Sequence, residues 1–191
     1  VETGERAAKA EGAGEVITVG TAPVKVEDQA SLNYGPEHTM SETVDSNPQN
    51  IFMLNMVEGD SDIAEGGFIA DATTAGEQGW KVGESYELSG MVPGKTTKVE
   101  LKGIYEDFQM LPKLAVSQKD VEKLLPGDAL TVAMVGVNAA EGVDLEQLRT
   151  NLEESVKELV VVQVASGEEY AGEAASMINQ MLTILYALLA L

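Results

Sequence analysis

The sequence predicts an α+β fold, and three segments lead to that class. Residues 98–105 alternate apolar and polar side chains, which is typical of a strand. Residues 130–137 are nearly all apolar, which predicts a strand covered on both faces. After the capping residue Asp144, apolar side chains recur at helical spacing, and a β-branched strand is predicted at residues 160–164. The helical positions are Leu145, Leu148, Leu152, Val156 and Leu159.

The N-terminal quarter predicts a short helix followed by a strand. Residues 2–11 suit a helix that Gly12 and Gly14 end, and residues 16–20 then read as a strand. Residues 21–50 have a weak pattern in which Asn, Gly and Pro mark turns, with one short strand at residues 43–45. The next apolar segment is residues 51–57.

The middle of the chain predicts a strand, a capped helix and a further strand region. Residues 68–70 form a short β-type step, after which Asp71 caps a helix that Gly79 ends in the left-handed conformation. Residues 80–89 read as a strand region interrupted by Gly83, and residues 91–95 contain a turn built on Pro93 and Gly94.

A second short helix is predicted at residues 117–125. Ser117 and Asp120 match the capping-box spacing, with Asp in the Glu position. Pro126 and Gly127 stop this helix before the apolar strand at residues 130–137.

Composition excludes several classes of function. The chain has 191 residues, a length that suits one domain or two small lobes, and a formal net charge of −20. Such a surface attracts no phosphate backbone, so a nucleic-acid partner is not expected. The chain has no cysteine and a single histidine, which removes thiolate catalysis and leaves little for histidine-based metal or acid–base chemistry.

The two ends of the sequence predict a membrane protein that has been cut. The first residue is Val1 and not Met, so we expect a processed or excised segment. Residues 177–191 contain no charged side chain and predict the start of a transmembrane helix. At about 1.5 Å per residue the segment spans only about 22 Å, against about 30 Å of hydrocarbon. A buried C-terminal core helix is the alternative.

Several short sequence segments, in the same order along the chain, resemble the extracytoplasmic domain of FtsX-like, MacB-type ABC-transporter permeases. In the middle of the chain they are NMVEGD at residues 55–60, GGFIADATTAGEQGWKVGESYELS at residues 66–89 and VELKGIYED at residues 99–107. At the end of the chain, EYAGEAASMINQMLTILYALLAL at residues 169–191 is similar to the helix that runs into the second transmembrane span of that family. Residues 21–50 match poorly.

The resemblance implies a two-lobed ectodomain. Residues 1–50 and 128–176 would form a membrane-proximal α/β lobe of β-α-β units, residues 51–127 an inserted β-rich lobe, and residues 177–191 the start of a transmembrane helix. That membrane-entry helix contains Met181, Leu182, Ile184, Leu185, Leu188 and Leu189. The resemblance also implies no cofactor and a separate cytoplasmic ATP-binding subunit, and the sequence contains no Gly-x-x-x-x-Gly-Lys-Ser/Thr phosphate loop.

Two polar features are candidates for a metal site or a catalytic residue. Asp60, Asp62 and Glu65 space oxygen atoms along a turn in a way that a calcium ion could use, but the EF-hand pattern is not met. A solvated turn is the expected structure. His38 lies between turn residues beside Glu37 and has no evident nucleophile, so no catalytic residue and no metal site is predicted.

Two aromatic residues and four methionines are candidates for surfaces that contact a partner. Trp80 and Tyr86 bracket the start of a strand and form a candidate partner surface, while packing in the core or at a sheet edge is the favoured alternative. Four methionines form a candidate apolar groove, or they fill a core that is poor in Phe and Trp. They are Met53, Met56, Met91 and Met110.

The resemblance to MacB-type permeases implies a non-enzymatic extracellular or periplasmic domain of a permease. It would couple ATP-driven motion in the cytoplasm to export of a substrate or to regulation of an outside partner, within a permease dimer held in the membrane. The alternative is a surface-anchored binding protein. An enzyme acting on the cell wall would need an acid pair in a cleft, which the spread of acidic residues cannot identify.

Overall fold

The computed structural model describes residues 2–33, 39–106, 113–125, 129–159, 162–169, 172 and 176. Its helices are α1 (Glu2–Ala8), α2 (Gln49–Phe52), α3 (Ala72–Gln78), α4 (Gln118–Glu122) and α5 (Leu145–Val156). Its strands are β1 (Ala13–Ala22), β2 (Lys25–Val26), β3 (Leu32–Asn33), β4 (Thr39–Val44), β5 (Met56–Gly59), β6 (Phe68–Asp71), β7 (Ser85–Ser89), β8 (Thr96–Tyr105), β9 (Leu114–Ser117) and β10 (Thr131–Ala139).

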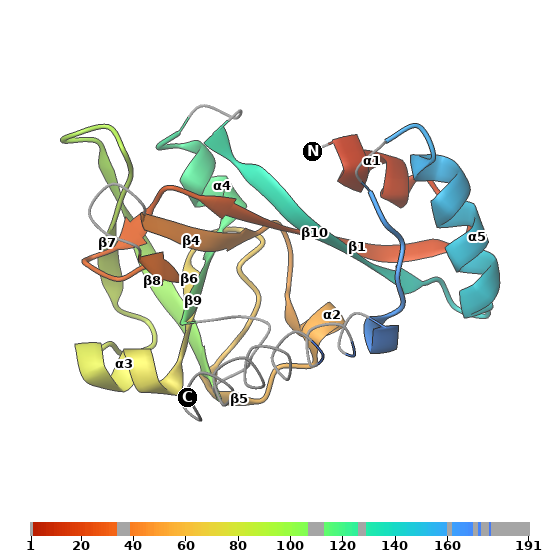
Figure 1. Cartoon of the computed structure of the whole chain (residues 1–191). Helices are drawn as coiled ribbons and strands as arrows, with labels where there is room; N and C mark the ends of the chain where they lie inside the picture. The colour runs from red at the N-terminus through yellow and green to blue at the C-terminus, as the bar shows by residue number, and fades with distance from the viewer. Residues whose placement is uncertain are drawn as a thin grey trace, which may run out of the picture.

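The strands form one mixed sheet in the order β10-β1-β4-β9-β6-β8-β7-β2, with β3 paired to β4 and β5 paired to β8. The β4–β9 and β6–β8 pairs are parallel, and the other pairs are antiparallel. Figure 1 shows α1 and α5 beside each other at one end of the sheet and the β7–β8 hairpin at the other. The α+β class predicted from the sequence is confirmed.

The connection from β6 through α3 to β8 is a crossover between parallel strands, and its helix has the predicted ends. Asp71 Oδ1 accepts a hydrogen bond from the Thr74 N–H at 2.7 Å, and Asp71 Oδ2 accepts one from the Thr74 hydroxyl at 2.9 Å. Gly79 ends the helix at a φ of 67°. Because a residue without Cβ adopts this conformation freely, both ends of α3 follow from local sequence.

The hydrophobic core lies on both faces of the sheet. Neighbouring residues of a strand point to opposite faces. Phe68 pairs with Val116 and belongs to one buried cluster, whereas Ile69 pairs with Ala115 and belongs to the other. All four side chains are fully buried, so β6 and β9 form the centre of the domain.

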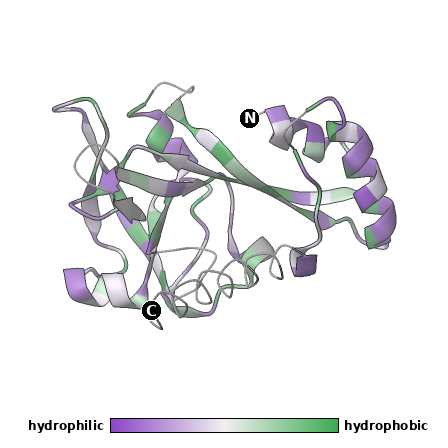
Figure 2. Cartoon of the chain, in the orientation of Figure 1, coloured by the Kyte–Doolittle hydropathy of each residue, from purple (hydrophilic) through white to green (hydrophobic). Residues whose placement is uncertain are grey.

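The apolar strand β10 is not covered on both faces, and that prediction is wrong. It pairs only with β1 and ends the sheet order among the described strands, and most of its residues are half-exposed. Figure 2 shows its apolar residues as green segments along the edge. Hydropathy reports the preference of a side chain, whereas its burial depends on the neighbours that the fold supplies.

The prediction of a strand at residues 160–164 also fails where it can be examined. Residues 162–164 have no strand structure, and residues 160–161 lie outside the described ranges. Here the backbone makes turn bonds, from the Leu159 N–H to the Val156 carbonyl and from the Val162 N–H to the Leu159 carbonyl. β-branched residues favour a strand only where a neighbouring strand can pair with them.

The predicted capping box of α4 is wrong, although the helix exists. The Ser117 side chain makes no capping hydrogen bond. Asp120 is buried instead, and its Oδ2 accepts a hydrogen bond from the Gly67 N–H at 2.7 Å. The Asp120 carboxylate therefore makes a tertiary contact with Gly67 and does not take part in a capping box at the start of α4.

Two other predicted boundaries change. The strand region expected at residues 80–89 is shortened to β7, because residues 81–84 include a turn closed by the Glu84 N–H and the Lys81 carbonyl. α4 ends at Glu122 and not at residue 125, and Pro126 and Gly127 lie outside the described residues.

The division into two lobes stays a prediction. Strands from the two predicted segments meet at the parallel β4–β9 pair, in which Glu42 is in register with Ala115 and Val44 with Ser117. Among the residues that the structure describes, none of the helices has the length and apolar character needed to cross a membrane. The predicted membrane-entry helix at residues 177–191 lies outside those residues.

Candidate functional site

The N-terminal helix and the segment around α5 are joined by ion pairs and hydrogen bonds. The Arg6 guanidinium is 3.1 Å from Glu158 Oε2 and 2.9 Å from Glu2 Oε1. The Asn151 side-chain amide donates to the Glu11 carbonyl at 2.7 Å. Hydrogen bonds to Glu158 and Glu2 raise the pKa of Arg6, which stays charged. We call this contact between α1 and α5 the α1–α5 junction.

A second ion pair connects α5 to the chain that follows it. Arg149 Nη1 is 3.1 Å from Glu169 Oε1. The Glu169 carboxylate also accepts from the Ser166 N–H at 2.8 Å, and the Glu169 N–H donates to the Ser166 hydroxyl at 3.1 Å. The bond from Ser166, followed by that from Arg149, lowers the pKa of Glu169. Ser166 and Glu169 form a capping box at the start of helical residues 167–169, and their Ser-x-x-Glu spacing is the signal in the sequence that indicates it.

A cavity of about 310 Å³ lies beside the α1–α5 junction, between α1, β1, β10 and the start of α4. Its polar lining includes Glu5, Thr18, Asp45 and Gln118. Asp45 Oδ1 accepts from the Thr18 N–H at 2.7 Å. Gln118 Oε1 is buried and has no hydrogen-bond partner among the described residues. Among the described residues that line it there is neither Cys nor His.

The acidic turn at Asp60, Asp62 and Glu65 uses its oxygen atoms within the protein. Asp60 Oδ1 accepts from the Asp62 N–H at 2.9 Å, and Asp62 Oδ1 accepts from the Ala64 N–H at 3.0 Å. Glu65 pairs with Lys119, which lowers the pKa of Glu65. In the described part of the chain no three acidic or histidine side chains are grouped to hold a metal ion. His38 lies outside that part.

Trp80 and Tyr86 form an aromatic cluster with Phe68. The Phe68 and Trp80 ring centroids are 5.3 Å apart with nearly perpendicular planes, and those of Trp80 and Tyr86 are 5.4 Å apart. Trp80 is 7% exposed, whereas Tyr86 is half-buried with its hydroxyl accepting from the Lys81 N–H and donating to Glu84. The Trp80 ring is therefore packed against the core, as the alternative predicted. A role of Trp80 and Tyr86 in binding a partner stays a prediction.

The four methionines do not form one described groove. Met53 and Met91 are 83% and 71% exposed, respectively, and Met56 packs against the buried cluster on one face of the sheet. Met110 lies outside the described residues. The sequence offers no signal that separates these environments, because methionine suits both core and surface.

Glu42 is a half-buried glutamate that the sequence did not single out, and its carboxylate oxygen Oε2 is fully buried. It lies on β4 in register with Thr21 on one side and Ala115 on the other, and its Oε2 has no hydrogen-bond partner among the described residues. Burial raises the pKa of Glu42 to about 7. In sequence it is one polar residue in a short strand, and only the two flanking strands bury it.

The geometry defines a class first: an α+β domain with a single mixed sheet, with α1 and α5 beside each other at one end and no group of acidic or histidine side chains among the described residues that could hold a metal ion. No family model matches the chain, and no curated protein is similar to it in sequence. Comparison with solved structures does find similar folds. The periplasmic region of MacB from Actinobacillus actinomycetemcomitans matches with a TM-score of 0.54 at 12% identity, over 82% of this chain and 72% of that chain.

A second solved structure is a domain from Porphyromonas gingivalis whose protein is assigned as a permease. It matches with a TM-score of 0.43 at 16% identity, over 78% of this chain and 72% of that chain. The likeness to the MacB region confirms the resemblance of fold that the sequence phrases indicated. At this level of identity the likeness concerns the fold.

Proposed function

We propose that this chain is the extracytoplasmic domain of an ABC-transporter permease subunit. It faces the extracellular or periplasmic side of the cell membrane and is not an enzyme. It transmits motion driven by ATP hydrolysis on a cytoplasmic subunit to an exported substrate or an outside partner, within a permease dimer. The observation that carries the proposal is the shared fold with the periplasmic region of MacB.

The α1–α5 junction supports a mechanical role. Residues 2–8 lie against the segment that leads to residues 158–169, so movements of these two parts of the chain reach the sheet at one end. The ion pairs of the junction lie near the surface, where such pairs hold little free energy and can exchange partners. A pair of transmembrane helices attached to these segments would therefore move them without breaking the core.

A disulfide experiment tests the proposal. The chain has no cysteine, so Arg6→Cys with Glu158→Cys adds the only thiols to this domain. In the full-length protein, reconstituted in membranes with its ATP-binding subunit, we expect a non-hydrolysable ATP analogue to change the yield of the disulfide. The control pair is Thr21→Cys with Thr131→Cys, which lie in register on β1 and β10 and whose yield stays constant.

Two results would count against the proposal. One is a full-length protein that associates with no ATP-binding subunit, which favours a surface-anchored binding protein. The other is a disulfide yield at the α1–α5 junction that the nucleotide leaves unchanged while the two subunits remain associated.

A further inference from the structure

The β7–β8 hairpin ends in an exposed apolar tip. Ser85–Ser89 pairs antiparallel with residues 96–100, and the loop between them is closed by a hydrogen bond from the Lys95 N–H to the Val92 carbonyl at 3.1 Å. Met91 is 71% exposed and Val92 is 48% exposed. Two neighbouring large apolar side chains on a projecting loop have no role in the core.

The base of the hairpin is packed into the core. Leu88 and Val99 are buried in the core cluster that contains Phe68, and β2 pairs with β7 on the outer side. Gly90 lies so close to the turn after α4 that a Cβ added there would be 3.2 Å from Leu125 Cδ2. The tip is therefore presented on a fixed support, which lowers the entropic cost of binding.

The tip differs in charge from the rest of the chain. Residues 88–99 contain two lysines and no acidic residue, within a chain of net charge −20. Neither Lys95 nor Lys98 forms an ion pair with another residue that the structure describes, although Lys98 is in register with Glu87. The tip therefore combines apolar surface with two lysines that have no acidic partner in the described part of the chain.

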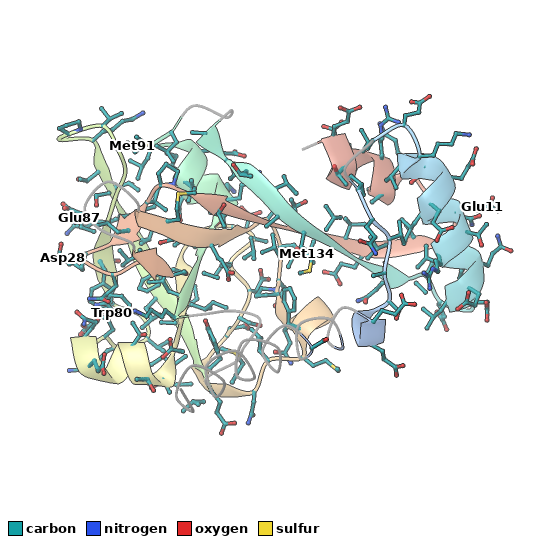
Figure 3. All side chains as sticks on the ribbon, in the orientation of Figure 1. Glu11, Asp28, Trp80, Glu87, Met91 and Met134 are labelled. Carbon is teal, nitrogen blue, oxygen red and sulfur yellow. The ribbon has the colours of Figure 1, made fainter. Side chains whose placement is uncertain are left out.

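The position of the tip favours a protein, and not a lipid surface, as its binding partner. Figure 3 labels Met91 at the end of the molecule opposite Glu11, which follows α1. The strongly negative body of the domain opposes close approach to an anionic bilayer. An acidic protein surface of limited size can meet the tip while avoiding most of the body.

We propose that the hairpin tip docks onto an acidic, apolar-lined surface of a partner protein. Met91 and Val92 enter the apolar part, and Lys95 and Lys98 pair with carboxylates around it. That this partner lies outside the membrane rests on the proposed function, whereas the chemistry of the contact rests on the tip alone.

Site-specific photo-cross-linking tests this inference. Benzoylphenylalanine replaces Met91 in the full-length protein in its own cells, and the control position is Met53, which is exposed to a similar degree. We expect a discrete adduct with another protein from position 91 only, joined to a peptide rich in Asp and Glu. Adding K95E and K98E should lower the adduct yield at least about fivefold, and K95Q with K98Q should lower it less.

The matched control for charge is K9E with K81E, which changes two exposed lysines away from the tip and leaves the adduct yield unchanged. Equal urea midpoints for all variants show that they fold alike. The inference is overturned by no adduct, by an adduct that survives K95E with K98E, or by an adduct with lipid or a second copy. Binding of the domain to phosphatidylglycerol vesicles that M91S abolishes also overturns it. The nucleotide-dependent disulfide at the α1–α5 junction is unaffected by any of these outcomes, so the two proposals fail separately.

Discussion

The Asp120 carboxylate accepts a hydrogen bond from the Gly67 backbone N–H at 2.7 Å, although the two residues are far apart in sequence. Asp120 is 5% exposed and its other oxygen pairs with Lys123. The bond fastens α4 to the loop before β6, next to the centre of the sheet. A buried, charge-assisted hydrogen bond of this kind has a larger effect than an exposed ion pair.

Replacing Asp120 should therefore destabilise the domain. We expect D120A to lower the free energy of unfolding by about 2–3 kcal/mol, because it leaves the Gly67 N–H buried without a partner. Urea unfolding measures the change. E122A is the control, since Glu122 is exposed on the same helix and bonds only to Gln118 in the described structure. Equal effects of the two substitutions would contradict the assignment.

Glu42 predicts a dependence of stability on pH. Its pKa is raised to about 7 from an unfolded value near 4.5, so the folded protein keeps a proton that the unfolded chain has lost. Its contribution to stability is therefore largest below pH 4.5 and falls as pH rises toward 7. Because Glu42 is partly exposed, we expect a loss on the order of 2 kcal/mol between pH 5 and 8.

E42Q should remove this loss, because the amide does not ionise. Urea unfolding of the wild type and E42Q across pH 5–8 gives a difference curve that isolates Glu42 from the other acidic residues. The exposed Glu77 is the control, and E77Q should keep the wild-type pH dependence. A difference curve for E42Q that is flat with pH would show that Glu42 ionises normally.

Gly103 on β8 should tolerate no side chain. A Cβ there would lie 2.3 Å from the Asp60 carbonyl oxygen, so G103A forces the backbone apart. We expect a cost of about 2–3 kcal/mol. In contrast, a Cβ on Gly76 in α3 meets nothing within 4 Å, and G76A should stabilise the domain by about 0.5–1 kcal/mol. Thermal unfolding should therefore shift in opposite directions for the two variants, and a shift in the same direction would be inconsistent with these contacts.

The cap of α3 gives a smaller effect. D71A removes both hydrogen bonds to Thr74 and should cost about 1–2 kcal/mol, because Asp71 is buried. D71S keeps a capping oxygen and should recover part of the loss. The free energy of unfolding of the three proteins checks this order, and a D71S as unstable as D71A would show that the loss comes from packing alone.

Local features were predictable where a residue interacts with its neighbours in sequence. Asp71 and Gly79 bound α3, and Asp144 caps α5 by accepting from the Glu146 and Gln147 N–H groups. Asp120 shows the limit of this reasoning. Its spacing from Ser117 predicts a helix cap, but its carboxylate accepts a hydrogen bond from the Gly67 N–H. Local spacing does not reveal a competing donor brought near by the fold.

The candidate sites follow the same division. The sequence drew attention to Trp80, Tyr86 and the acidic turn, all conspicuous by residue type. It passed over Glu42, whose burial depends on β1 and β9. It named the turn at residues 91–95 and Met91 separately, but it did not reveal that Met91 is exposed at the end of a hairpin.

The sequence by itself determined the α+β class, the ends of α3, the negative surface and the likeness in fold to MacB-type domains, because caps, turns, charge and phrase order are local properties. Only the tertiary structure decided which strands are neighbours, that β10 ends the sheet among the described strands, and that Asp120 and the Oε2 atom of Glu42 are buried. The physical reason is that burial and pairing are properties of two or more segments at once. The type of a residue sets its preference for burial or for a strand, whereas the segments packed against it decide whether it is buried or paired.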